Sequence, residues 1–338
     1  MQFKKIEELK VGMRLARPIY NRNGVLLYER NSKLTQQGIS SIKNFGLIGL
    51  FILEPAEPVP PMSAEDIEFE RFQTINVFAI MDELERIVNT GRTGKLQIIV
   101  SNIIKSYGHL DKKINFIQNL RSREDYQYKH ALNVAILCAM ISNKLNLKIE
   151  ERLDVVTAAL LYDLRDSGLI EKICSSSPNV KRFCHQAETI GYGIEDGKID
   201  PSVKLMEGGK ILAVSQVFDK MTAMNMEQPP ESEVAAIRYL LGHPEFFSKD
   251  VVNALMKSIN ILSPGVCVEL NIGEKALVLA ENEYDIFCPM VLVFSDNSVL
   301  DLADRSVYGD VEITDVMKTM DNRYVMDTET LKKYGLNL

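Results

Sequence analysis

The sequence predicts a mainly α-helical protein that carries a small α+β module at its N-terminal end and a β-meander near its C-terminal end. Two observations support this fold class. Through the middle of the chain, apolar residues recur at intervals of three and four, the spacing of one helix face. Towards both ends, apolar and polar residues alternate with a period of two, which is typical of half-buried strands.

Composition narrows the class of protein. The chain has 338 residues, of which 46% are hydrophobic and 25% charged, as in ordinary globular proteins of more than one unit. A net charge of −7 argues against nucleic acid as a partner. The first ten residues are too charged for a secretory signal, and the longest uncharged apolar run, residues 131–143, is shorter than the roughly 20 residues that span a bilayer. We therefore expect a cytoplasmic protein without a membrane span.

Residues 1–53 are expected to form the α+β module. Residues 13–20 and 25–28 alternate as strands around an Asn-Arg-Asn-Gly turn, which predicts a hairpin. Thr35 is placed to cap a short helix, and residues 47–53 form a further apolar strand. Residues 54–62 follow as a linker, because four prolines among them favour an extended backbone.

Residues 63–263 are expected to be helical. A helix starts at Ser63 or Ala64 and is broken at residues 91–94, a Gly-Arg-Thr-Gly sequence that fits a turn between helices better than a phosphate loop. The stretch 125–166 predicts two consecutive core helices, with His130 and Asp163 leaning towards the buried side. Between Gly168 and Gly209 the apolar pattern thins, which predicts irregular backbone. Further helices are expected at residues 210–223, 231–241 and 249–259.

The period changes to two after Pro264. Residues 264–303 predict a four-stranded β-meander. Residues 304–338 form a polar tail in which residues 313–320 predict one weakly amphipathic helix. The five cysteines show no C-x-x-C spacing, so we expect reduced thiols and no zinc knuckle.

Four blocks of sequence resemble one family. The central helices, KILAVSQVFDKMTA at 210–223, SPGVCVELNIGEKALVL at 263–279 and ELKVGMRLARPIYNRNGVLLYE at 8–29 resemble HD-GYP proteins, the bacterial cyclic di-GMP phosphodiesterases of the HD superfamily. The resemblance covers roughly residues 6 to 303 and implies an HD-type helical core at 63–263. It also implies a site in which histidines and carboxylates bind two or three metal ions, usually iron or manganese, that activate a hydroxide.

The resemblance assigns three vestigial metal ligands. His130 matches the first family histidine, Asp163 the aspartate of the His-Asp signature, and His185 a histidine of the paired-histidine segment. Three ligand positions are replaced, by Tyr126, Tyr162 and Gln216. The Gly-Tyr-Pro motif has a remnant in Gly191, Tyr192 and Gly193, and Asp219 matches a second, structural aspartate.

The surviving set is too small for the family's chemistry. Three ligands can hold one divalent ion but cannot assemble a bridged metal pair. The expected function is therefore that of a catalytically inactive HD-GYP-like signalling protein that acts by binding a protein partner, or cyclic di-GMP without cleaving it, and needs no cofactor. The alternative is a metal-dependent cyclic di-GMP phosphodiesterase, or a residual phosphohydrolase, with iron or manganese at His130, Asp163 and His185. Dimerisation through the long helices after the linker stays open.

Overall fold

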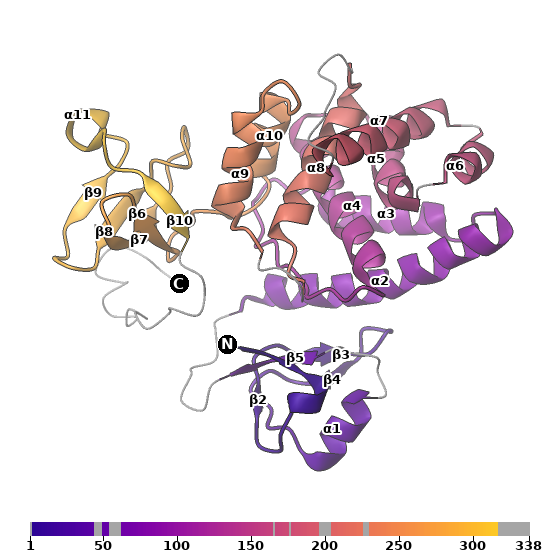
Figure 1. Cartoon of the computed structure of the whole chain (residues 1–338), viewed down its shortest axis with the longest axis horizontal. Coiled ribbons are helices and arrows are strands. Elements are labelled where there is room, and N and C mark those ends of the chain that lie inside the picture. The colour runs from indigo at the N-terminus through magenta and orange to yellow at the C-terminus, as the bar shows by residue number, and fades with distance from the viewer. Residues whose placement is uncertain are drawn as a thin grey trace.

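The structure, a computed structural model, describes residues 2–43, 49–53, 62–164, 166–175, 177–195, 204–225 and 230–316. Most of the proline-rich linker and residues 317–338 of the predicted tail lie outside the described residues. In Figure 1 the N-terminal module lies beneath the long helix α2, and the C-terminal sheet lies on the far side of α9 and α10 from the central helices. The protein is mainly α-helical, as the sequence predicts.

The N-terminal module consists of a small antiparallel sheet, a hairpin and a helix with a core of their own. The predicted hairpin is present, with Ile19 opposite Tyr28, and Thr35 caps the helix by accepting a hydrogen bond from the Gly38 N–H at 3.0 Å. The sheet order is β1-β5-β2. The elements are β1 (Gln2–Lys5), η1 (Ile6–Glu8), β2 (Arg14–Leu15), β3 (Ile19–Tyr20), β4 (Leu26–Tyr28), α1 (Gln36–Lys43) and β5 (Gly49–Leu53).

Ten elements make up the described part of the helical region. Its centre is formed by α4 and α8, whose residues are buried all round from His130 to Ser142 and from Ile211 to Asp219. Helices without a polar face are found in the interior of a fold. The elements are α2 (Ala64–Thr90), α3 (Leu96–Tyr107), α4 (Tyr126–Lys144), α5 (Ile149–Leu161), η2 (Tyr162–Leu164), α6 (Ser167–Ile173), α7 (Pro178–Glu195), α8 (Glu207–Thr222), α9 (Glu233–Gly242) and α10 (Lys249–Met256).

The ends of α2 follow local sequence rules. Ser63 and Asp66 form a capping box at its start, and Gly91 ends it in the left-handed conformation, with φ of 62°. The next turn is closed by Glu83, whose buried carboxylate accepts hydrogen bonds from the N–H groups of Gly94 and Lys95 at 2.6 and 2.8 Å and of Leu96 at 3.1 Å. These are the donors that a phosphate would need. The Gly-Arg-Thr-Gly sequence is therefore a turn between helices, as predicted.

The irregular backbone expected between Gly168 and Gly209 is a wrong prediction for most of that segment. Helix α6 and the 18-residue helix α7 occupy it, and α7 starts at Pro178, a residue suited to the first helical position. Phe183, Ala187 and Ile190 are buried at helical spacing on one side of α7. Two glycines near the end of α7 weakened the pattern, but packing of this apolar side against α5 and α8 outweighs their low helix propensity.

The C-terminal sheet has five strands rather than the predicted four. Residues 313–316, expected to begin a helix, form strand β10 and pair with β6, so that Ile313 lies opposite Leu270. β-branched Ile313, Thr314 and Val316 favour a strand, and the open edge of β6 supplies the pairing. The order is β10-β6-β7-β8-β9. The elements are β6 (Cys267–Leu270), β7 (Lys275–Ala280), β8 (Met290–Val293), β9 (Val299–Asp301), α11 (Arg305–Tyr308) and β10 (Ile313–Val316).

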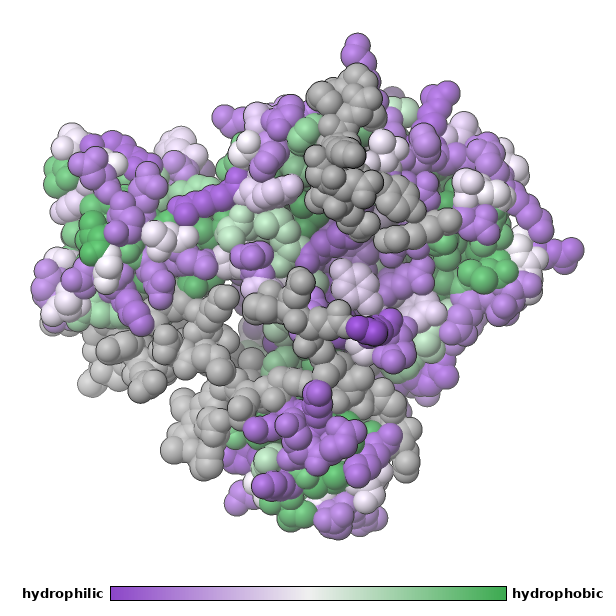
Figure 2. Space-filling model, viewed as in Figure 1, coloured by the Kyte–Doolittle hydropathy of each residue, from purple (hydrophilic) through white to green (hydrophobic). Residues whose placement is uncertain are grey.

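The two smaller parts differ in how they join the helical region. One face of the C-terminal sheet, including Val268, Val278 and Val291, belongs to the same apolar core as the helices. The N-terminal module keeps a separate core and meets α2 through side chains such as Arg17 and Arg22. In Figure 2 hydrophilic side chains cover much of the visible face of the N-terminal module and of the C-terminal part. No helix in the described ranges has the length and apolar character needed to cross a membrane.

Candidate functional site

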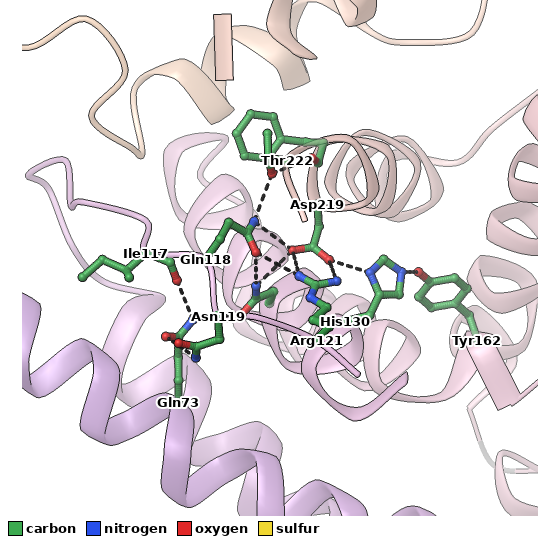
Figure 3. A network of polar contacts seen from close by, with 11 residues as sticks. Gln73, Ile117, Gln118, Asn119, Arg121, His130, Tyr162, Asp219 and Thr222 are labelled. Atoms are coloured by element: carbon green, nitrogen blue, oxygen red, sulfur yellow. Dashed lines mark hydrogen bonds and ion pairs between the residues drawn. The ribbon is translucent and has the colours of Figure 1, made fainter. Parts of the chain in front are cut away.

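A fully buried carboxylate, that of Asp219 on α8, forms the centre of a polar network inside the helical region (Figure 3). Arg121 donates to both of its oxygens, from Nη2 to Oδ1 at 2.6 Å and from Nη1 to Oδ2 at 2.7 Å. Asn133 and Gln118 donate further hydrogen bonds to Oδ1 at 3.0 and 3.2 Å, and His130 Nδ1 lies 2.5 Å from Oδ2. Five contacts therefore surround one carboxylate, which compensates for its removal from water.

His130 on α4 links Asp219 to Tyr162. Its Nδ1 faces the carboxylate, which only accepts when ionised, so Nδ1–H is the donor. Its Nε2 lies 2.5 Å from the hydroxyl of Tyr162 on η2. Tyr126 stacks on the imidazole, with ring centroids 5.7 Å apart, and the guanidinium of Arg121 lies over the Tyr126 ring. Both ring nitrogens of His130 are thus used within the protein.

Burial and neighbouring charges shift the pKa values of the carboxyl, the guanidinium and the phenol of Tyr162. Burial opposes ionisation of Asp219, but the charge of Arg121 and the hydrogen bonds from His130 and Arg121 hold the pKa of this carboxyl well below its usual range. Burial also opposes the charge of Arg121, and Asp219 outweighs it and raises the pKa of the guanidinium. Burial and the nearby Asp163 raise the pKa of Tyr162 well above that of a free phenol. The site therefore holds an ionised pair beside a neutral phenol.

A second ring of polar side chains supports the centre. Gln118 donates to Thr222 Oγ1 at 3.0 Å and accepts from Arg121 Nη2 at 2.9 Å and from Asn133 at 3.0 Å. Gln73 on α2 donates to Asn133 Oδ1 at 3.0 Å. No spacing pattern in the sequence pointed to these residues or to Arg121. One available signal was Asn133, an amide inside the apolar run of α4, because a buried amide in an otherwise apolar helix needs partners.

Asp163, His185 and Gln216 have different surroundings from His130. Asp163 is half-buried on η2, and its main-chain oxygen accepts from Gln127 Nε2 at 2.9 Å. His185 is exposed on α7. Gln216 is buried on α8, and its Nε2 donates to the Ala187 oxygen at 3.0 Å while its Oε1 has no hydrogen-bond partner.

The Gly-Tyr-Pro remnant is part of a helix. Gly191, Tyr192 and Gly193 all have their backbone in α7. A Cβ atom at Gly191 would lie 3.4 Å from Gln216 Oε1, so α7 and α8 approach closely here. Gly191 therefore lies against Gln216, and the structure brings Tyr126 and Tyr162 against His130.

The residues present do not fit a metal pair. Within the described part of the chain, no group of three or more His, Cys, Asp and Glu side chains is arranged to hold a metal ion. His130 offers no free nitrogen, since Asp219 and Tyr162 engage both. The positive charge that the carboxylate needs is supplied by Arg121, where a metal ion would meet repulsion from the guanidinium. No step of metal-assisted hydrolysis can be derived from this arrangement.

Among the described residues, the phenols and thiols are poor candidates for an activated nucleophile. The site contains two phenols, Tyr126 and Tyr162, and burial raises the pKa of both. All five cysteines are free, as predicted, and burial raises the pKa of Cys138 to about 12 and those of Cys174 and Cys288 to about 11. Thiols with such pKa values are poor nucleophiles at neutral pH. The side-chain contacts of the network join α2, the segment that precedes α4, α4, η2 and α8.

Comparisons of the chain with protein families, with curated proteins and with solved structures found no match.

Proposed function

We propose that the chain is a non-catalytic, HD-GYP-like signalling protein that acts by binding a partner protein or a ligand. The observation that carries this proposal is the occupation of His130, whose two ring nitrogens are bonded to Asp219 and Tyr162. A metal ligand must present a free nitrogen lone pair. The same residue, in the block that resembles the family's first histidine, is used here for internal cohesion.

The arrangement of the replaced positions supports the same function. Tyr162 stands where the family has the histidine of its signature pair, and its hydroxyl supplies the hydrogen bond that His130 would otherwise lack in the buried interior. Arg121 neutralises the buried carboxylate of Asp219 without a metal ion. Loss of ligands is thus accompanied by contacts that keep the helices packed, which is what a binding module requires.

The test combines metal analysis with an assay for hydrolysis. The full chain, expressed in medium supplemented with iron and manganese, is purified, its metal content is measured, and cyclic di-GMP is offered as substrate. We expect less than one metal ion per chain and no turnover. Two bound ions with turnover of cyclic di-GMP would contradict the proposal and support the phosphodiesterase alternative.

The ligand is tested separately from catalysis. Calorimetric titration with cyclic di-GMP distinguishes a nucleotide receptor from a module that binds protein partners. Binding without cleavage identifies the receptor, whereas absence of binding leaves a protein partner as the proposed class. A variant with His130→Gln separates a residual phosphohydrolase from a core role: loss of a measured activity in a protein that is still folded would favour the enzyme.

A further inference from the structure

An extended segment joins the N-terminal module to the buried network. Residues 115–121, here called the strap, run between α3 and α4 without forming a helix. Backbone hydrogen bonds hold the residues at either end: the Asn260 N–H donates to the Ile114 oxygen at 2.8 Å, and the Arg121 N–H donates to the Met224 oxygen at 2.8 Å. The position of the strap between these two points depends on side chains from other elements.

Three strap carbonyls are satisfied by side chains from three parts of the molecule. The Ile117 oxygen accepts from Gln73 Nε2 of α2 at 3.1 Å, and the Leu120 oxygen accepts from Lys129 Nζ of α4 at 2.7 Å. The Gln118 oxygen accepts from Nη1 of Arg17, which belongs to the N-terminal module, at 3.2 Å. The module therefore contributes directly to fixing the strap.

Gln118 also makes contacts through its side chain, in addition to the contact of its backbone oxygen with Arg17. Its side chain points into the network and contacts Asp219, Thr222 and Arg121, as Figure 3 shows. Since one residue meets Arg17 through its backbone and Asp219 through its amide, a shift of the strap changes the hydrogen bonds of the carboxylate that His130 also binds. A contiguous series of contacts thus runs from the module to His130.

Where the N-terminal module meets α2, one buried polar atom lacks a hydrogen-bond partner. Arg17 lies over the ring of Phe51 and forms an ion pair with Glu70, in which Nε and Oε1 are 3.6 Å apart. Oε1 of Glu70 is buried and has no hydrogen-bond partner. The ion pair between Arg121 and Asp219 is closer, at 2.6 and 2.7 Å, although Nε of Arg121 also has no hydrogen-bond partner. Because the Arg17–Glu70 contact is longer and leaves an acceptor without a donor, opening of the assembly is cheaper there.

We propose that the strap couples docking of the N-terminal module to the state of the buried network, so that release of Arg17 loosens the bond between His130 and Asp219. The coupling is reciprocal, because any linkage between two sites acts in both directions. It gives the module a route by which an event at its own surface reaches the helical core. This inference does not depend on the proposed function, since it concerns the folded chain with or without a ligand.

Histidine NMR tests the coupling in the full-length protein. The chain has four histidines, so ¹⁵N-histidine labelling yields few ring signals, and single His→Gln variants at 109, 185 and 243 identify that of His130. We expect Arg17→Ala to shift the Nδ1–H signal of His130 and to speed its exchange with water about fivefold, as for the loss of one net hydrogen bond. Arg17→Lys, measured in the same way, is expected to have a smaller effect and serves if Arg17→Ala does not fold.

Arg22→Ala is the matched control. Arg22 also joins the module to α2, through both oxygens of Asp82 and over the ring of Phe78, but it does not contact the strap. It should leave the His130 signal unchanged. An equal change in both variants would overturn the role of the strap, and an unchanged His130 signal in both Arg17 variants would overturn the coupling itself.

The coupling can also be measured from the buried network towards the N-terminal module. Thr222→Val removes the hydroxyl that accepts from Gln118 while leaving Asp219 and His130 in place. We expect faster backbone amide exchange in β2 and β5 of the N-terminal module. Unchanged exchange in both strands would contradict a reciprocal coupling.

Discussion

Two buried carboxylates in this protein, Asp219 in the core and Glu70 at the contact with the N-terminal module, have opposite surroundings. Asp219 receives five contacts, including a bidentate ion pair with Arg121, and the pKa of its carboxyl is held low. Burial raises the pKa of Glu70, and the more distant charge of Arg17 offsets this only in part. Burial opposes the charge of both carboxylates, and the number and distance of the donors decide whether the pKa ends below or above its usual value.

Removing the charge of Asp219 should have the largest effect. Asp219→Asn leaves the guanidinium of Arg121 buried without its counter-ion, and we expect a loss of about 3–5 kcal/mol in the free energy of unfolding at pH 7. Urea denaturation measures it, with Asp82→Asn, at an exposed ion pair, as the control. A loss as small as that of the control would show that Asp219 is not the centre of the network.

Asp219→Asn should also change how the free energy of unfolding depends on pH. The folded-state pKa of Asp219 lies below the unfolded value of about 4, so its contribution is complete above that pH and is lost as the pH falls through the folded pKa. The parent protein should therefore lose stability as the pH drops below about 4, and Asp219→Asn should lose less over the same range. Parallel curves for the two proteins would contradict this assignment.

The next largest effect is expected at Tyr162, which contacts the second ring nitrogen of His130. Tyr162→Phe removes the hydroxyl that meets His130 Nε2 and leaves a buried nitrogen without a partner, at a cost of about 1–3 kcal/mol. The same change at Tyr284, whose side chain is 99% exposed, should alter stability by less than about 0.5 kcal/mol. Equal effects at both positions would mean that the Tyr162 hydroxyl contributes nothing to the network.

Glu70 should affect the pH dependence of stability in the opposite direction to Asp219, and Glu70→Gln tests this. The folded-state pKa of Glu70 is raised, so the folded chain holds more protons than the unfolded chain between the two pKa values, and stability falls as the pH rises through that window. We expect the variant to differ from the parent by less than about 1 kcal/mol at pH 7 and to gain relative stability as the pH rises from 5 to 8. A relative loss over that range would contradict the comparison.

Arg22→Ala should have the smallest effect. Both partners of the Arg22–Asp82 pair are more than half exposed, so water and salt screen the interaction. We expect a change of about 0.5 kcal/mol, decreasing further in 1 M salt, by the same denaturation measurement. A change comparable to that of Tyr162→Phe would show that the module is held mainly through this pair.

Local rules account for the parts of the fold that were predicted. The helix start at Ser63 or Ala64, the break at residues 91–94 and the hairpin at residues 19–28 depend on residues a few positions apart, and all three are present. The error at α7 arose because packing outweighed the low helix propensity of its glycines. The error at β10 arose because its pairing with β6 involves residues distant in the sequence. At the site, His130 was identified, whereas Arg121 and Gln118 were not, because they lie in an extended segment without a periodic pattern.

The sequence alone was enough to determine a mainly helical protein with a β-structure at each end, since periodicity and capping are local properties. Only the tertiary structure decided what the buried polar residues do. Arg121 and Asp219 are 98 positions apart, and their ion pair exists because the strap and α8 meet in the core. The partners of His130 were decided in the same way, by which side chains the packing of α4, α8 and η2 brought within hydrogen-bond distance.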